Sequence, residues 1–262
     1  MSAHDLSLAA GVLPEFTADQ VAEAAAAAGF GMAGFTAHPE RWNTGMTRRV
    51  RQITERESLV VLDVEVVWIP EGGRLDDGHR LIVDVAHDLG ARNLLVVSSE
   101  PDVGRTAEAL HRLCGWAAPG GLRVALEFLM ITAIRTLDAA VSAVLACGHP
   151  SAGVLVDALH LQRAGHQPSD LRALEAHLLP YVQLCDGRRD CGTAQADYLE
   201  DALDLRSAPG EGELPLKALL EVLPDDCPLS LEVRSRYYRD TYPDPAARAA
   251  AIRRRTLEFL SG

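Results

Sequence analysis

The sequence predicts a single (β/α)8 barrel that extends over residues 1–262, and three observations support this prediction. Short apolar runs alternate with amphipathic helical runs, the alternation repeats eight times, and 262 residues is close to the typical length of such a barrel. An open, doubly wound sheet is the other arrangement of alternating elements, but no G-x-G-x-x-G motif follows the first apolar run. We find no linker and no second domain.

The eight strands are predicted from short apolar runs rich in Val, Ile and Leu, which are typical of parallel strands buried on both faces. In chain order the predicted strands are Leu6–Ala9, Gly31–Thr36, Leu59–Val67, Asn93–Ser98, Arg123–Phe128, Gly153–Asp157, Tyr181–Cys185 and Leu229–Val233.

The helices are predicted from apolar residues spaced three and four apart and from stop signals such as Gly29 and Gly90. In chain order the predicted helices are Ala18–Ala28, Thr47–Glu57, Asp77–Leu89, Val103–Ala117, Ala133–Ala146, Ser169–Leu178, Pro215–Val222 and Pro245–Leu260. The longest connection is the polar segment Asp186–Glu213, after the seventh strand. Long connections in compact domains are usually functional or disordered.

Composition and charge argue against several classes of function. Hydrophobic residues make up 48% and charged residues 24% of the chain, and the formal net charge is -12. An acidic protein repels nucleic-acid backbones and anionic membranes, so we expect neither as a partner. No apolar stretch is long enough to span a membrane, no signal peptide is visible, and the five scattered cysteines are typical of reduced thiols. These features predict a cytoplasmic protein.

Four polar side chains stand near the ends of the last four predicted strands: Glu127, Asp157, Gln183 and Glu232. A buried carboxylate is costly unless something compensates its charge. The carboxyl ends of barrel strands meet at the face that carries the chemistry, and oxygen ligands favour magnesium, manganese or calcium over a structural zinc. Helix capping or pairing with a cation is the alternative for each residue alone. Four in register on adjacent strands favour a metal site.

The same residues carry a resemblance to a known family. The chain resembles, over its whole length, the xylose isomerase-like TIM-barrel superfamily of sugar and sugar-phosphate isomerases and epimerases. The markers are Glu127, the D-x-x-H spacing of Asp157 and His160, the run PGEGELP at 209–215, and Glu232 in LEV. Many members of this superfamily have histidine where this chain has Gln183. Hydroxypyruvate isomerases share that difference, and the chain also resembles them.

The resemblance implies a set of metal ligands and a pair of catalytic groups. One divalent metal ion, manganese or magnesium with cobalt or zinc as alternatives, would be bound by Glu127, Asp157, Gln183 and Glu232. Glu127 and Glu232 would exchange a proton with the carbon next to the substrate carbonyl, through an enediolate that the metal stabilises. The resemblance also implies a small-molecule partner, namely a keto sugar or polyol-like keto compound, and a homodimer or homotetramer.

Two substrate contacts are also implied by the resemblance. His160 would donate a hydrogen bond to a substrate oxygen, with packing at the start of a helix as the alternative. An arginine six residues after Gln183 would bind substrate oxygens. That arginine is Arg189. The neighbouring Arg188 is the alternative contact, and either arginine could instead be a solvated residue of the loop.

Three more residues are predicted to line the substrate site because they follow or end strands at the catalytic face. His38 follows the second predicted strand, while Glu65 and Trp68 lie at the end of the third. Trp68 would offer an apolar wall, although it could equally pack beneath a loop.

The leading hypothesis is therefore a metal-dependent isomerase or epimerase acting on a small keto sugar or polyhydroxylated keto compound. A lyase is the alternative, because the superfamily includes inosose dehydratases, 3-dehydroshikimate dehydratases and subunits that cleave C-glycosides. All of these begin by removing a proton beside a carbonyl. An AP endonuclease would need further histidine ligands and a basic DNA-binding face. A non-catalytic metal-binding barrel would not need both Glu127 and Glu232.

Overall fold

The computed structural model describes residues 4–262 and contains a closed barrel of eight parallel strands, which confirms the predicted (β/α)8 fold. Each strand pairs with its neighbours in sequence order, and β1 pairs with β8 to close the sheet. Closure leaves no strand edge free. The strands are β1 (Leu6–Leu8), β2 (Met32–Thr36), β3 (Val60–Ile69), β4 (Asn93–Ser98), β5 (Arg123–Glu127), β6 (Ala152–Asp157), β7 (Val182–Leu184) and β8 (Leu229–Leu231).

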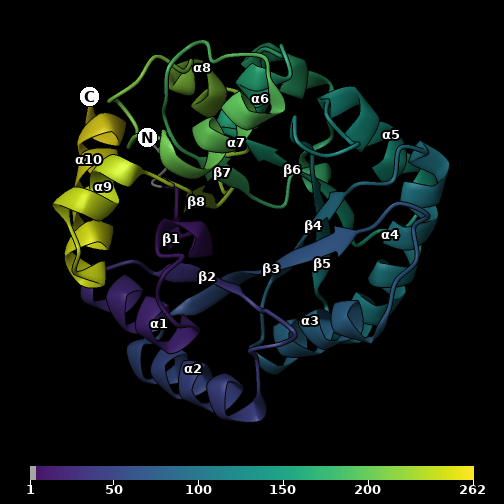
Figure 1. Ribbon diagram of the computed structural model, residues 1–262, viewed down its shortest axis with the longest axis horizontal. Helices are drawn as coiled ribbons and strands as arrows, with labels where there is room; N and C mark the ends of the chain where they lie inside the picture. Colours follow the sequence, from purple (N-terminus) through teal and green to yellow (C-terminus); the bar gives the residue numbers. More distant parts are fainter. Residues whose placement is uncertain (1–3) are drawn as a thin grey trace.

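The helices form an outer ring around the strands (Figure 1). The α-helices of residues 4–262 are α1 (Ala18–Ala27), α2 (Thr44–Glu57), α3 (Asp77–Asp88), α4 (Val103–Ala117), α5 (Leu137–Cys147), α6 (Ala158–Arg163), α7 (Gln195–Asp204), α8 (Leu216–Leu220), α9 (Arg236–Thr241) and α10 (Pro245–Ser261). Short 3-10 helices are η1 (Ala10–Val12), η2 (Ala118–Gly120), η3 (Pro168–Ala173) and η4 (Ala176–Leu178). None of the helices in this part of the chain is both long and apolar enough to cross a membrane.

The hydrophobic core has two layers. Inside the barrel, a small cluster that includes Met32, Leu62, Leu95, Leu155 and Tyr181 fills the space between the strands. A larger cluster lies between the strands and the surrounding helices. The interior of the barrel is therefore a packed core, and a ligand site can form only above it, at one mouth of the barrel.

Capping side chains set several helix starts that differ from the predicted ones. Helix α5 begins at Leu137 rather than Ala133, because the Thr136 side chain accepts a hydrogen bond from the backbone N–H of Ala139. Helix α2 begins earlier than predicted, because the side chain of Asn43 caps it in the same way.

The helix predicted over Ser169–Leu178 is wrong. That stretch forms the short helices η3 and η4, and the helix that follows β6 is α6, which starts at Ala158 directly after the strand. Asp157 ends the strand and its side chain accepts the backbone N–H of His160, so the chain turns into a helix at once. Gly165, with a φ of +79°, then ends that helix.

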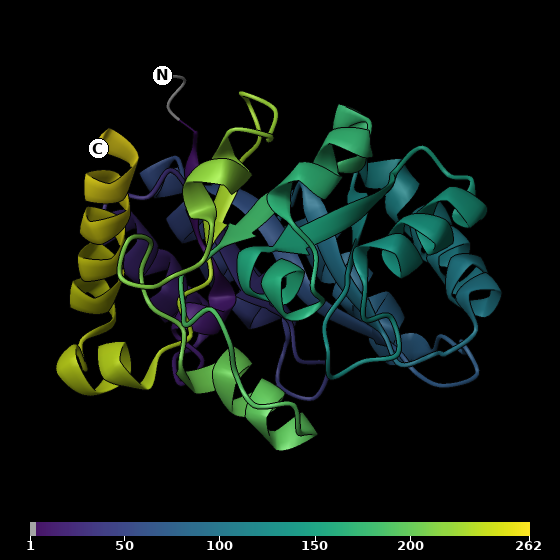
Figure 2. The ribbon, with the colours of Figure 1, turned by 90° about the horizontal axis from the view of Figure 1, so that it is seen from above.

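The long connection after β7 contains a helix that was not predicted, α7, and β8 is followed by another, α9. Both project from the same end of the barrel (Figure 2). Arg236 of α9 forms ion pairs with Glu200 and Asp204 of α7, at 3.3 and 3.2 Å. These two helices therefore build a shared rim over one mouth of the barrel.

Candidate metal centre

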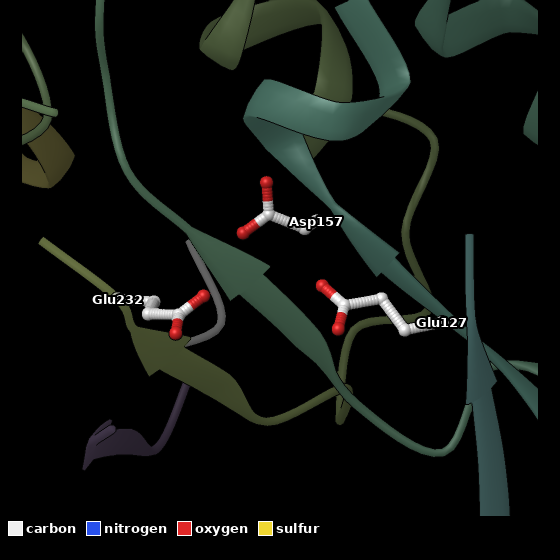
Figure 3. A group of neighbouring side chains, drawn as sticks. All are labelled: Glu127, Asp157 and Glu232. Carbon is white, nitrogen blue, oxygen red and sulfur yellow. The ribbon is translucent and has the colours of Figure 1, made fainter. Parts of the chain in front are cut away.

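The four predicted metal ligands lie at the carboxyl ends of neighbouring strands. Glu127 is the last residue of β5, Asp157 the last residue of β6, and Glu232 follows β8 directly. Gln183 lies within β7 and is the direct neighbour of Asp157 in the parallel register. The three carboxylates point toward one another from their separate strands (Figure 3). The barrel thus brings together residues that are far apart in the sequence.

The three carboxylates are close enough to share one cation. One oxygen from each of Glu127, Asp157 and Glu232 lies within 4.8 Å of the other two. All three side chains are buried. A divalent ion sits about 2.0–2.6 Å from each oxygen ligand, so a single ion can contact all three. Three carboxylates this close repel one another unless protons or a cation lie between them.

Burial shifts the pKa of two of these groups upward. It raises the pKa of Glu127 well above its ordinary range, and the charges of Glu232 and Asp157 raise it further. Burial also raises the pKa of Glu232 to about 7, although Arg206 acts in the opposite direction. Burial would raise the pKa of Asp157 too, but Arg206 and His160 outweigh it and hold that pKa below its ordinary value. The centre thus contains one carboxylate whose ionised form is favoured and two carboxyl groups that take up protons readily.

A buried arginine that the sequence analysis did not single out completes the centre. Arg206 Nη1 donates to Asp157 Oδ2 at 2.5 Å and lies 3.3 Å from Glu232 Oε2. Its Nε donates to the carbonyl of Ala202, at the end of α7. Only 3% of Arg206 is exposed, so its charge compensates part of the acidic cluster where water cannot.

Helix α7 holds Arg206 in place. Arg163 of α6 forms a buried ion pair with Asp201 of α7 at 2.7 Å, and it also donates to the carbonyls of Arg188 and Arg189. The sequence signal for this arrangement is weak. The length of the connection marks it as functional, but Arg206 stands in DALDLRSAPG without any recognisable motif.

The amide of Gln183 faces two of the carboxylates. One terminal atom of its amide lies 3.2 Å from Glu127 Oε1 and 3.1 Å from Glu232 Oε2. With the nitrogen at that position, Gln183 donates a hydrogen bond to each carboxylate. In the metal-free protein this donating orientation is favoured. With the oxygen there, protons on the carboxyl groups or a cation would have to lie between the three oxygens. A rotated amide would offer its oxygen, and with three carboxylates this donor set fits a hard divalent metal.

His160 lies beside the centre as a neutral ring. Its Nε2 is 3.9 Å from Glu127 Oε1 and 3.3 Å from Arg206 Nη2. A guanidinium can only donate, so Nε2 is the acceptor and the proton sits on Nδ1. Burial lowers the pKa of His160 to about 4, against the pull of the nearby Asp157 charge. His160 is therefore neutral, and its accepting Nε2 faces the centre.

The other predicted site residues have different positions. Glu65 is buried, accepts a hydrogen bond from the Thr36 hydroxyl at 2.8 Å, and lines a cavity together with the exposed His38. Trp68 is 43% exposed and donates to the Ser99 hydroxyl at 2.7 Å.

Arg188 and Arg189 are both exposed on the connection after β7. The arginine that contacts the carboxylates is Arg206, so the structure does not bring the side chain of Arg189 into this centre. Its contact with substrate stays a prediction.

A cavity of about 390 Å³ adjoins the centre between η1, α1, β2, β3 and the segment after β8. Gly11 lines it, and a Cβ atom at Gly11 would lie 2.7 Å from Glu232 Oε1. The volume is in the range of small-molecule sites. A larger hollow of about 570 Å³ lies on the outside of α1 and α2, where none of the clustered carboxylates reaches it.

Together, the closed barrel and the carboxylate cluster define a (β/α)8 protein with a candidate metal centre at the mouth of the barrel. The family model for the xylose isomerase-like TIM barrel matches residues 15–260, so the chain belongs to that family.

Comparison with curated proteins finds the 3-dehydroshikimate dehydratase of Pseudomonas putida, which is 27% identical over 265 residues. The match covers 95% of this chain and 40% of the dehydratase, so the chain spans about two fifths of that protein. The dehydratase activity is thus a property of a much longer chain.

Two solved structures share the fold. A xylose isomerase-like TIM barrel/4-hydroxyphenylpyruvate dioxygenase fusion protein matches with a TM-score of 0.82 and 24% identity, over 96% of this chain and 42% of that one. The IolI protein, whose structure contains a zinc atom, matches with a TM-score of 0.80 and 17% identity, over 98% of both chains. At these identities the likeness shows the fold alone.

Proposed function

We propose that this protein catalyses divalent-metal-dependent proton transfer at the carbon next to a carbonyl of a small keto compound. The observation that carries the proposal is the convergence of Glu127, Asp157 and Glu232 within 4.8 Å at the carboxyl ends of the strands. Three buried carboxylates in contact are costly for stability alone, and perturbed ionisable groups gather at functional sites.

The four oxygen-bearing residues Glu127, Asp157, Gln183 and Glu232 would hold the metal. The ion would polarise the substrate carbonyl and stabilise the negative charge that develops when the neighbouring proton leaves. Their hard oxygen atoms favour magnesium or manganese. Zinc, which the structure of IolI contains, is a further candidate.

The side chains of this protein supply the proton transfer. Glu127 on β5 and Glu232 after β8 approach the centre from different strands, so each can face a different side of a bound substrate. Glu232, whose pKa burial raises to about 7 in the metal-free protein, is a carboxyl group that can take up and release a proton. Asp157, whose pKa is lowered, stays ionised. The neutral His160 would form a hydrogen bond with a substrate oxygen.

Two outcomes can follow removal of the proton. If the proton returns to the neighbouring carbon or to the opposite face of the same carbon, the enzyme is an isomerase or an epimerase. This outcome is our leading candidate for a keto sugar or polyhydroxylated keto compound. If a hydroxyl group on the next carbon leaves as water, the enzyme is a dehydratase. The 27% identity to a 3-dehydroshikimate dehydratase supports that second candidate.

Deuterium exchange tests the proposal and separates the two outcomes. The magnesium-loaded protein is incubated in heavy water with keto sugars, inososes and 3-dehydroshikimate, and the products are followed by proton NMR and mass spectrometry. Deuterium beside the carbonyl without loss of water indicates an isomerase or epimerase. A new vinylic or aromatic signal indicates a dehydratase. Absence of exchange with every compound would contradict the proposal and favour a non-catalytic barrel.

A further inference from the structure

The cavity beside the metal centre has an apolar wall and an unusual distribution of charge. Leu13, Phe16, Phe35, Trp42 and Met46 supply apolar surface on one side. Its charged lining residues are two glutamates, Glu15 and Glu65, and two arginines, Arg41 and Arg234. A compact ligand with an apolar face and a charged group would match such a lining.

Arg234, which is half-buried, differs from the two buried arginines near this end of the barrel. Arg206 pairs with Asp157 and Glu232, and Arg248 pairs with Glu15 at 2.6 Å. Within residues 4–262, Arg234 has no ion pair, and its buried Nε has no hydrogen-bond acceptor. A buried donor without an acceptor is costly, so an acceptor supplied by a ligand would be bound favourably here.

Gly11 brings Arg234 and Glu232 to the same place. A Cβ atom at Gly11 would lie 2.7 Å from Glu232 Oε1 and 3.0 Å from Arg234 Cδ. Both side chains therefore lie against the bare α-carbon of this glycine. A group held by Arg234 would thus sit next to the carboxyl group that exchanges the proton, which confines the ligand to a compact molecule.

The glutamates of the cavity do not neutralise Arg234. Glu15 is bound by Arg248, and Glu65 accepts the hydroxyl hydrogen of Thr36. Neither glutamate therefore contacts Arg234, and a carboxylate ligand would match the planar fork of its guanidinium.

We propose that the cavity between η1, β2, β3 and the segment after β8 binds the carboxylate of a compact keto acid, with Arg234 as the principal anchor and Arg41 as a second cation. The inference rests on the proposed function and names its substrate class. The carboxylate lies at Arg234, the carbon skeleton lies against Phe35 and Trp42, and the reacting end lies at Glu232. Among the small keto compounds proposed above, keto acids are therefore preferred over neutral keto sugars, which leave Arg234 without an acceptor.

Calorimetry with matched ligands tests this assignment. The magnesium-loaded protein is titrated with 3-dehydroshikimate, with its neutral methyl ester, with hydroxypyruvate and with fructose 6-phosphate. We expect at least one acid to bind, and 3-dehydroshikimate to bind about tenfold or more tightly than its ester. Arg234→Gln should remove that preference, and Arg234→Lys should retain part of it. Arg254→Gln, an exposed position on α10 whose partner is Glu258, is the matched control.

Several results would overturn the carboxylate site. These are failure of both acids to bind, equal binding of acid and ester, a preference that survives in Arg234→Gln, and tighter binding of the sugar phosphate through Arg234. Manganese binding followed by electron paramagnetic resonance checks that Arg234→Gln keeps its metal centre. Acid binding through Arg234 without any deuterium exchange would refute the proposed reaction and leave the carboxylate site standing.

Discussion

The β5–β8 half of the barrel carries anionic side chains that converge on one point, whereas the half from β1 to β3 contributes an apolar cavity. Arg206 lies among Asp157, Glu232 and His160. Arg234, only two residues after Glu232, faces that cavity without a carboxylate partner in residues 4–262. The two arginines at this barrel mouth thus differ in their partners. Arg206 is paired with carboxylates of the centre, whereas Arg234 acts on Glu232 only through its charge and is the residue that we propose to bind a carboxylate.

The buried carboxyl groups of the two halves also differ in their hydrogen-bond and charge partners. Asp63 of β3 is fully buried and neither of its oxygens has a hydrogen-bond partner in residues 4–262. Burial raises its pKa well above the ordinary value. The nearby charges of Glu65 and Glu232 raise the pKa of Asp63 further, whereas Arg206 beside Asp157 lowers the pKa of that group. The surroundings decide which carboxyl groups can serve as metal ligands.

The largest expected effect comes from removing the groups that exchange the proton. Glu127→Gln and Glu232→Gln keep the shape of the side chain but cannot transfer a proton, so each should slow deuterium exchange about 10²–10⁴-fold. Glu258→Gln, an exposed position on α10, should leave the rate unchanged. Substantial activity in the Glu127→Gln/Glu232→Gln double variant would refute the assignment.

Replacing the two arginines separates their roles in stability. Arg206→Met leaves buried carboxylates without their cation and should lower the free energy of unfolding by about 3–5 kcal/mol in metal-free protein. Arg234→Met breaks no ion pair and should change it by about 1 kcal/mol or less. Urea unfolding in the presence of EDTA measures both variants. Equal losses would show that the two sites do not differ as described.

The pH dependence of stability isolates Glu232. Its pKa in the folded protein, about 7, lies above the ordinary 4.5, so ionisation opposes folding as the pH rises between these values. The free energy of unfolding of metal-free wild type, relative to Glu232→Gln, should fall by about 3 kcal/mol from pH 4.5 to 7. The pKa of His160 is lowered from 6.5 to about 4, so its contribution to the free energy of unfolding rises with pH between these values. This contribution is present in both proteins.

Urea unfolding at each pH, with and without manganese, gives this comparison. Manganese should restore the stability of the wild type above pH 7, because the bound cation balances the negative charge of the ionised carboxylates. A difference between wild type and Glu232→Gln that does not change with pH would count against a perturbed Glu232.

The smallest effect is expected at Gly11, where the two regions meet. Gly11→Ala places a methyl group against Glu232 Oε1, at the end of one flexible side chain, and against Arg234 Cδ, in the middle of another. The free energy of unfolding should change by about 1 kcal/mol or less, whereas turnover should fall about tenfold as Glu232 shifts. Ala10→Gly in the same short helix is the control for backbone effects. Unchanged turnover in Gly11→Ala would place Glu232 away from the reaction.

The barrel and the four strand-end residues were predictable because alternating elements fix which strand ends meet. Glu127, Asp157, Gln183 and Glu232 each mark a strand end in the sequence itself. Arg206 was not predictable, because an unforeseen helix and a buried pair between Arg163 and Asp201 carry it into the centre. The expectation for Arg189 came from the family resemblance, and a resemblance cannot report how the connection after β7 folds in this chain.

The cavity and the position of Arg234 in it could not be predicted from the sequence either. In LEVRSR, Arg234 is one of two nearby arginines, and only the approach of Gly11 from the other end of the chain distinguishes it. Contacts between segments so distant in sequence depend on the closed sheet, where β1 pairs with β8.

Equilibrium dialysis against manganese tests the central claim most directly, namely that the β5–β8 carboxylates form one metal centre and Arg234 does not belong to it. We expect about one ion per chain in the wild type and in Arg234→Gln, and none in the Glu127→Gln/Glu232→Gln double variant. A wild type that binds no manganese, or a double variant that still binds one ion, would contradict the account.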